Sequence, residues 1–242
     1  MKAYAEYFKE GGLVYRRNTL LQFGNSWSLI GNVVLANPGS AEPIAAASND
    51  ILDLVSSFYE EFRSGENVQP ENWHEFSPDS TMRFVEKIFN GWYLGKNIEL
   101  NGVVQLFNTF NIKNQNLQEA VTQIGVESDL LFSYTIYKYF NDKPTYFGFS
   151  NEVLRNDVLR NVAMNIFSKS SKVVRSIYSE NFSENSFYHP MYINQAYGQK
   201  HFQKYKNEVL SEIVKTHNQG TQTDCANLQP LSLVVRNSQG KQ

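Results

Sequence analysis

The chain has 242 residues, of which 41% are hydrophobic and 14% aromatic, enough for one large domain with a packed core. Its 22 basic and 24 acidic residues give a net charge of -2, so any contact with nucleic acid has to be made by a local patch. The single cysteine, Cys225, excludes an internal disulfide and a four-cysteine zinc or iron–sulfur site, and we expect neither a metal nor a cofactor. No apolar run reaches the roughly 18 residues of a membrane span, and the first residues mix charges with aromatics, so we expect a cytoplasmic monomer with no membrane contact.

Strands and helices alternate along the first half of the chain. A β-branched apolar run at 33–36 predicts a buried strand that stops at Asn37-Pro38-Gly39, and a second run at 103–107 predicts a strand that stops at Asn108. Apolar residues at helical spacing predict helices at 51–62 and 82–89, and the polar segment 64–80 between them is expected to be irregular.

The second half continues the alternation. It predicts helices at 117–124, 128–139, 153–167 and about 196–214, and strands at 145–149 and 173–178. From 217 onward the chain is rich in polar residues, so residues 217–242 are expected to form a loose tail in which 231–236 could add an edge strand.

The alternation predicts one α/β domain at 1–216, with a helical insertion at about 42–101. Helices on both faces of a parallel sheet give a three-layer α/β/α architecture, here with a central, mostly parallel sheet of four strands. In such a sheet the ligand crevice lies at the carboxyl ends of the strands, where Asn37, Asn108 and His189 are expected. Each also has a plain structural explanation: a turn, a strand-closing residue and an unliganded loop histidine.

Three segments taken in order carry a family resemblance. They are Asn37-Pro38-Gly39-Ser40-Ala41 after the first strand, the strand at 103–107 ending in Asn108, and Tyr188-His189-Pro190 followed by a basic, aromatic helix. The trio resembles the uracil-DNA glycosylase superfamily, and the Asn-Pro-Gly turn is most similar to its mismatch-directed thymine and uracil branch. The segment 31–41 is also similar to uncharacterised bacterial and phage proteins with a strand ending in Asn-Pro-Ser-Thr-Ala.

The resemblance implies a DNA glycosylase that hydrolyses the base–sugar bond of a flipped base, in repair or in defence against phage DNA. It implies catalytic roles for Asn37, which handles the attacking water, and for His189. The implied substrate-binding residues are Pro38, Gly39, Ser40, Phe107, Asn108 and Phe110. The implied DNA-binding residues are Pro190, Met191, Tyr192, Lys200, His201 and Lys204, with Met191 and Tyr192 standing where other members continue with Ser.

The side chains themselves suit this chemistry. The Asn37 amide oxygen can hold a water molecule although it is no strong base, and His189 can donate a hydrogen bond to the departing base. Asn108 offers a donor and an acceptor to a base edge, and Phe107 or Phe110 could stack on the base. Glycine at position 39 leaves room beside the pyrimidine 5-position, which favours a 5-substituted or modified pyrimidine over uracil.

Two other classes of function stay open. In the first, the pocket recognises a nucleotide or modified base without cleaving it. In the second, an aromatic surface around Trp73, Phe76, Trp92 and Tyr93 binds another protein, and Asn-Pro-Gly is only a turn.

Overall fold

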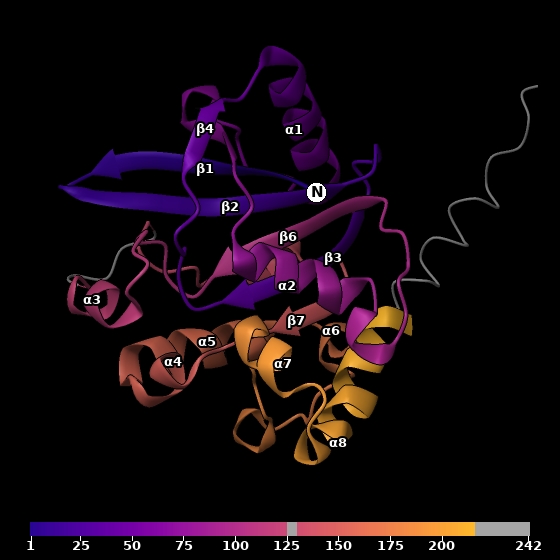
Figure 1. The fold of residues 1–242 in the computed structure, drawn as a ribbon. Coiled ribbons are helices and arrows are strands. Elements are labelled where there is room, and N and C mark those ends of the chain that lie inside the picture. The colour runs from indigo at the N-terminus through magenta and orange to yellow at the C-terminus, as the bar shows by residue number, and fades with distance from the viewer. Residues whose placement is uncertain (125–129, 216–242) are drawn as a thin grey trace, which may run out of the picture.

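In the computed structural model, residues 1–124 and 130–215 are described, and they form a mixed α/β fold around one seven-stranded sheet (Figure 1). The strand order is β4-β5-β1-β2-β6-β3-β7. The strands are β1 (Lys2–Glu10), β2 (Leu13–Phe23), β3 (Leu29–Leu35), β4 (Pro43–Ala46), β5 (Trp73–Phe76), β6 (Gly102–Asn108) and β7 (Thr145–Phe147).

The expectation of a mostly parallel, four-stranded sheet is wrong in strand number and direction. Only β3 runs parallel to its neighbours β6 and β7, whereas the pairs β1–β2, β1–β5, β2–β6 and β4–β5 are antiparallel. The missed β1–β2 hairpin turns at Gly11-Gly12, where both residues have positive φ, a turn that glycine adopts without steric cost. The segment 42–101, expected to be a helical insertion, also contains β4 and β5.

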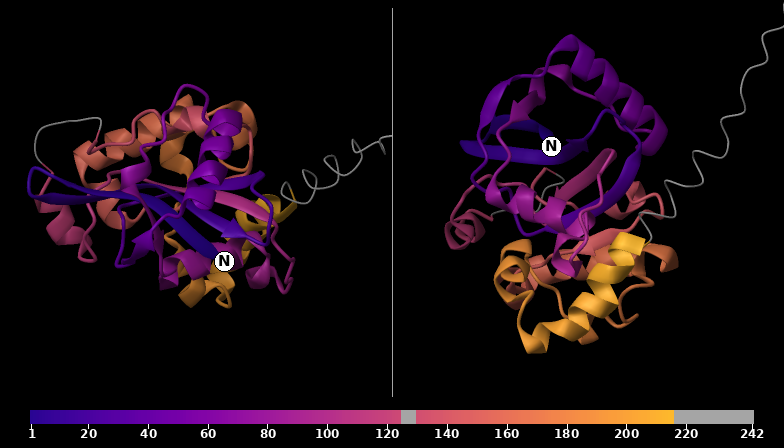
Figure 2. Two further views of the ribbon diagram at one scale, coloured as in Figure 1. Left: turned by 90° about the horizontal axis from the view of Figure 1, so that it is seen from above. Right: turned by 45° about the vertical axis from the view of Figure 1, so that its right-hand side comes forward.

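The helices cover both faces of the sheet. They are α1 (Asn49–Phe62), α2 (Ser80–Phe89), α3 (Leu117–Thr122), α4 (Asn151–Arg155), α5 (Asp157–Lys169), α6 (Lys172–Arg175), α7 (Pro190–Ala196) and α8 (Gln203–Tyr205). A π-helical turn, Lys206–Leu210, follows α8. In both Figure 1 and the right-hand view of Figure 2, α1 and the C-terminal helices lie at opposite ends of the molecule.

Short helical turns of the 3-10 type fill several connections. They are Pro70–Asn72, Trp92–Leu94, Ile136–Tyr139, Phe182–Glu184 and Lys200–Phe202. The predicted helix at 128–139 is wrong at 130–135, and only its last turn is helical; residues 128 and 129 lie outside the described residues.

The predicted strand at 173–178 is also wrong. Residues Lys172–Arg175 form the short helix α6, which begins where the Ser171 hydroxyl accepts a hydrogen bond from Val174 N at 3.2 Å. The N-cap hydrogen bond of Ser171 therefore outweighs the strand preference of the β-branched pair Val173-Val174, of which only Val174 is buried. The predicted tail, with its possible edge strand, lies outside the described residues.

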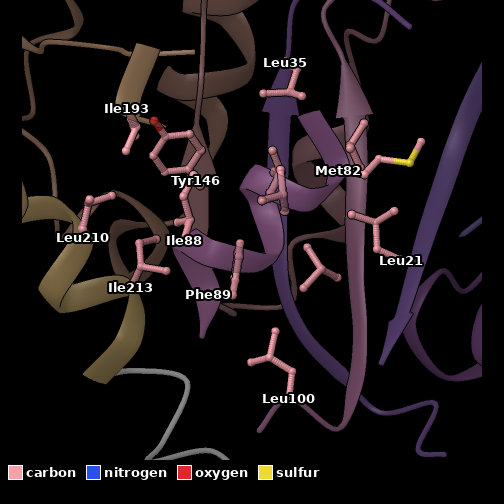
Figure 3. Close-up of a cluster of buried hydrophobic side chains, with 14 of the residues drawn as sticks. Leu21, Leu35, Met82, Ile88, Phe89, Leu100, Tyr146, Ile193, Leu210 and Ile213 are labelled. Atoms are coloured by element: carbon pink, nitrogen blue, oxygen red, sulfur yellow. The ribbon is translucent and has the colours of Figure 1, made fainter. Parts of the chain in front are cut away.

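Alternate residues of β6 show how the layers form. Val104 and Leu106 pack in a cluster with side chains of α2, α7 and the helical turns between Lys200 and Leu210. Val103 and Phe107 face the other side, where α1 and α5 pack. Figure 3 shows Ile88 and Phe89 of α2 between the sheet and the C-terminal residues Leu210 and Ile213. No described helix has the length and apolar content needed to cross a bilayer.

A buried polar row runs across the centre of the sheet. Asn32 of β3 is in register with Gln105 of β6 and Thr145 of β7. Gln105 Nε2 donates to Asn32 Oδ1 at 2.9 Å, and Asn32 Nδ2 donates to Thr145 Oγ1 at 3.1 Å. Arg63, at the end of α1, donates from Nε to Gln105 Oε1 at 2.6 Å, so the row ties α1 to three strands.

We expect Gln105→Leu to lower the free energy of unfolding by about 3 kcal/mol, because it removes the acceptor of a buried guanidinium and the donor to Asn32. Denaturant unfolding measures the change. The matched control is Gln118→Leu on the exposed face of α3, which should change stability by less than about 0.5 kcal/mol. A loss no larger than that of the control would show that the polar row contributes little.

Candidate functional site

A cavity of about 500 Å³ opens at the carboxyl ends of the parallel strands. Its volume is within the range of small-molecule sites. Its wall includes the turn after β3, the end of β6, the starts of α2 and α7 and one residue of β2. The sequence-predicted residues that line it are Asn37, Gly39, Ser40, Asn108, His189, Met191 and Tyr192.

The structure therefore brings Asn37, Asn108 and His189 into one cavity, as predicted. Asn37 and Asn108 come there because β3 and β6 are parallel and end together, with Leu35 opposite Asn108. His189 arrives differently. No strand precedes it; it is the N-cap of α7, which packs beside α2.

Asn37 is oriented by the loop that follows β6. Its Nδ2 donates to the backbone oxygens of Asn114 at 2.8 Å and Pro38 at 3.1 Å, with a longer contact to Ile112 O at 3.5 Å. Because the nitrogen is engaged, the acceptor Oδ1 is the amide atom that remains for a ligand or a water molecule. Thr109 strengthens the same junction, since its N and Oγ1 both donate to Leu35 O, at 2.7 and 2.8 Å.

Asn108 is the most unusual side chain of the site. It is 1% exposed, yet neither its Nδ2 nor its Oδ1 hydrogen bonds to any described residue. A buried amide normally satisfies both groups, because each unmade hydrogen bond costs about 1–3 kcal/mol. Asn108 lines this cavity and a second one, so the unused N–H donors and the unused acceptor of its amide lie in the cavity wall.

His189 is held with a defined hydrogen-bonding direction. Met191 N donates to His189 Nδ1 at 3.3 Å, so the neutral ring carries its proton on Nε2, where it can be donated. Burial lowers the pKa of His189 below the ordinary 6.5, although the negative charges of Asp79 and Glu152 oppose the shift. Near neutral pH the ring is thus an uncharged hydrogen-bond donor.

Asp79 is a functional candidate that the sequence did not reveal. As the N-cap of α2 it accepts a hydrogen bond from Met82 N through Oδ1 at 2.9 Å, which directs the carboxylate into the cavity. Apart from Pro38 and Ser40, its Oδ2 is the one heavy atom of the described residues within 4 Å of where a Cβ on Gly39 would stand, at 3.3 Å. The Asn-Pro-Gly turn therefore faces a carboxylate, and Gly39 leaves open space on its other sides. A Ser-Pro-Asp-Ser capping pattern, 77–80, was the available signal.

Arg16 is the second residue that sequence reasoning missed at this site. The pair Arg16-Arg17 is one candidate in the sequence for a local basic patch that meets nucleic acid, but Arg16 is only 2% exposed and lines the cavity. It is brought there by β2, one of the strands that were not predicted. Glu152, at the start of α4, supplies a further carboxylate.

Several predicted contacts lie elsewhere. Phe107 and Phe110 do not line this cavity: Phe110 is fully buried, and Phe107 faces a second cavity of about 290 Å³ on the other side of Asn108. Pro38, within the Asn-Pro-Gly turn, and Pro190, the first residue of α7, are both buried and do not line the cavity. Lys200, His201 and Lys204 are exposed and outside the cavity, but His201 Nε2 contacts Tyr192 Oη at 3.2 Å and so connects the basic segment to the cavity rim.

The predicted aromatic protein-binding surface is not present as such. Trp73, Phe76 and Tyr93 are at most 2% exposed and belong to the core, which leaves Trp92, at 40%, as the exposed member. Among the described residues, no three His, Cys, Asp or Glu side chains lie close enough to hold a metal ion.

Comparison with known proteins gives no relative on which to base an assignment. No protein-family model, no curated protein and no solved structure matches the chain.

We expect Asn108→Leu to leave the free energy of unfolding unchanged or to raise it by up to about 1 kcal/mol, because no hydrogen bond is lost and a desolvated amide is removed. The matched control is Asn32→Leu, the same change at an amide whose groups are all paired, which should cost about 3 kcal/mol. Denaturant unfolding compares the two. An equal loss in both variants would show that the Asn108 amide is satisfied in solution.

A second expectation concerns pH. The unfolded chain protonates His189 near pH 6.5, whereas the folded chain resists protonation until a lower pH, so the unfolded state binds more protons as pH falls through this window. The contribution of His189 to the free energy of unfolding is therefore fully present above pH 6.5 and is lost as the pH falls below that value. His189→Gln should therefore make the fall in unfolding free energy between about pH 8 and about pH 5 smaller. An unchanged fall would contradict the burial of a neutral ring.

Proposed function

We propose that this protein binds a nucleobase in the cavity and releases it from DNA by hydrolysis of the base–sugar bond. The observation that carries the proposal is the buried Asn108 amide with its unused donor and acceptor. The order of the three motifs, which resembles that of the uracil-DNA glycosylase superfamily, supports the same reaction.

Recognition of the base is the role of Asn108. Its Nδ2 and Oδ1 form a side-by-side donor and acceptor, which complements an adjacent carbonyl and ring N–H on the pairing edge of a pyrimidine such as thymine. Such an edge is accessible only when the base has left the helical stack. The open space at Gly39 favours a pyrimidine with a 5-substituent, which is the finer substrate class that we propose.

The water is held between Asn37 and Asp79. Asn37 Oδ1 accepts one hydrogen bond from the water molecule, and Asp79 Oδ2 takes its proton as the oxygen bonds to the sugar C1′. The electron pair of the breaking base–sugar bond leaves with the base. The two side chains thereby divide the tasks of positioning and deprotonation, because an amide alone cannot accept the proton.

His189 stabilises the departing base. Its Nε2–H donates a hydrogen bond to a base oxygen on which negative charge develops, an interaction that is stronger in the transition state than in the bound substrate. A neutral imidazole is sufficient for this task because no proton has to be transferred.

DNA would approach along the rim formed by α7 and the basic segment after it. Met191 and Tyr192 are exposed there, at 46% and 39%, and Tyr192 stacks on Tyr188 with ring centroids 5.0 Å apart. Apolar and aromatic side chains in such a place can fill the gap that a flipped base leaves in the duplex. Lys200 and Lys204 would contact phosphates, in keeping with the local patch that a chain of net charge -2 requires.

The test is single-turnover release of free bases, detected by mass spectrometry, from a panel of plain and modified DNAs. We expect Asn37→Ala and Asp79→Asn each to slow release by about 100-fold with little loss of DNA affinity. Asn37→Asp should keep or raise activity, because a carboxylate both accepts a proton and stabilises the cationic sugar. Asp79→Asn preserves the helix cap, since Asn caps as well as Asp.

The control variant is Glu152→Gln, which changes another carboxylate of the same cavity and should have a smaller effect. If wild type releases no base from any DNA but binds one of them through Asn108, recognition without cleavage replaces the glycosylase. If it neither releases nor binds, a nucleic-acid function is rejected.

A further inference from the structure

Arg16 is a buried cation without an ion-pair partner among the described residues. Burial lowers the pKa of its guanidinium to about 10, with Asp79 and Glu42 opposing the shift, so it stays protonated near neutral pH. Nη1 donates to Ala41 O at 3.3 Å, which is the one side-chain hydrogen bond that Arg16 makes to a described residue. Nε is buried and has no partner in the described part of the chain.

Neither nearby carboxylate forms an ion pair with Arg16, and each has another contact. Glu42 forms an ion pair with Lys113 at 2.5 Å, and Asp79 Oδ1 caps α2. The ring of Phe76, 5.4 Å from Arg16 Cζ, offers a cation–π contact that offsets part of the desolvation. A buried guanidinium with five donors and one hydrogen bond is nevertheless left short of partners, and the lining of the cavity is where a partner could reach it.

A second feature points to the same place. The first turn of the ten-residue helix α2 lines the cavity together with Arg16, through Ser80 and Thr81. The backbone N–H groups of these two residues make no hydrogen bond to a described residue. The next one, Met82 N, donates to Asp79 Oδ1. Free amides at the positive end of a helix favour an anion.

We propose that Arg16 and the first turn of α2 form an oxyanion-binding subsite, so that the ligand recognised by Asn108 carries an acidic group. The group is a phosphate or a carboxylate. Both present a pair of oxygen atoms that a guanidinium fork can bind. Asp79 and Glu152 carry negative charge into the same cavity, so an anion is favoured only where the guanidinium and the helix amides act together. The inference rests on the proposed recognition of a base, but not on its release.

The two sources of the oxyanion differ in where it is attached. A phosphate would belong to the sugar–phosphate backbone beside the flipped nucleotide. A carboxylate would belong to a substituent of the base, in the space that Gly39 leaves open.

Binding of three small probes to the full chain, measured by calorimetry near neutral pH, separates them: thymidine, thymidine 5′-monophosphate and 5-carboxy-2′-deoxyuridine. We expect at least one acidic probe to bind about 10-fold more tightly than thymidine. Tighter binding of the monophosphate assigns the subsite to the backbone, and tighter binding of the carboxylated nucleoside assigns it to the base.

Two variants at one exposed position test the helix amides. Ser80→Pro removes the N–H at the first helical position, where Pro is favoured, and Asp79 before it already has the extended backbone (φ -79, ψ 178) that precedes a proline. Ser80→Ala removes the same hydroxyl but keeps the N–H. We expect Ser80→Pro to reduce the preference for the acidic probe by about fivefold and Ser80→Ala to reduce it less than about twofold.

Arg16→Met should abolish the preference and leave the affinity for thymidine unchanged, while Arg16→Lys should retain part of it. If the Arg16 variants do not fold, the two Ser80 variants decide.

Equal affinities for all three probes, no binding of any probe, or an intact preference in Arg16→Met or Ser80→Pro would overturn the subsite. A protein that releases bases without this preference keeps the proposed function, and one with the preference but no release keeps the subsite alone.

Discussion

The buried hydrogen-bonded row of Arg63, Gln105, Asn32 and Thr145 is the constraint on which the rest of the structure depends. Apolar strands in a parallel sheet can slide by two residues and still bury their side chains, but a slide here would leave a guanidinium and two amides unpaired. With Asn32 opposite Gln105, Leu35 must lie opposite Asn108. The polar row therefore places the Asn-Pro-Gly turn and the Asn108 amide at the same edge.

Asn32 and Asn108 differ in the hydrogen bonding of their side chains. Both are buried amides on neighbouring strands, yet Asn32 makes three hydrogen bonds and Asn108 makes none to the described residues. The same sheet is thus able to satisfy an amide fully. An amide that it leaves unsatisfied beside a cavity is better explained by a ligand than by poor packing.

The parallel part of the sheet could be predicted from the sequence, whereas its antiparallel extension could not. β3 and β6 contain short apolar runs with clear stops. β1 and β2 mix charges with apolar residues: Arg17 pairs with Glu6 across them, and the hairpin end is exposed. Asn37 and Asn108 could be predicted because the apolar runs of β3 and β6 stop there. His189 could be predicted from its His-Pro motif alone, because the strand expected before it is the helix α6. Arg16 and Asp79 could not, since one depends on the pairing of β2 and the other on where α2 begins.

The charges of the cavity also bear on the proposed reaction. Cleavage of a base–sugar bond develops positive charge on the sugar and negative charge on the base, and the cavity supplies both kinds of partner. Asp79 provides a carboxylate beside the turn that would hold the water, while the base would meet the uncharged donors of Asn108 and His189. A protonated His189 would bind the departing base more strongly but would also repel the cationic sugar, so the burial that keeps the ring neutral suits a site that must stabilise both charges at once.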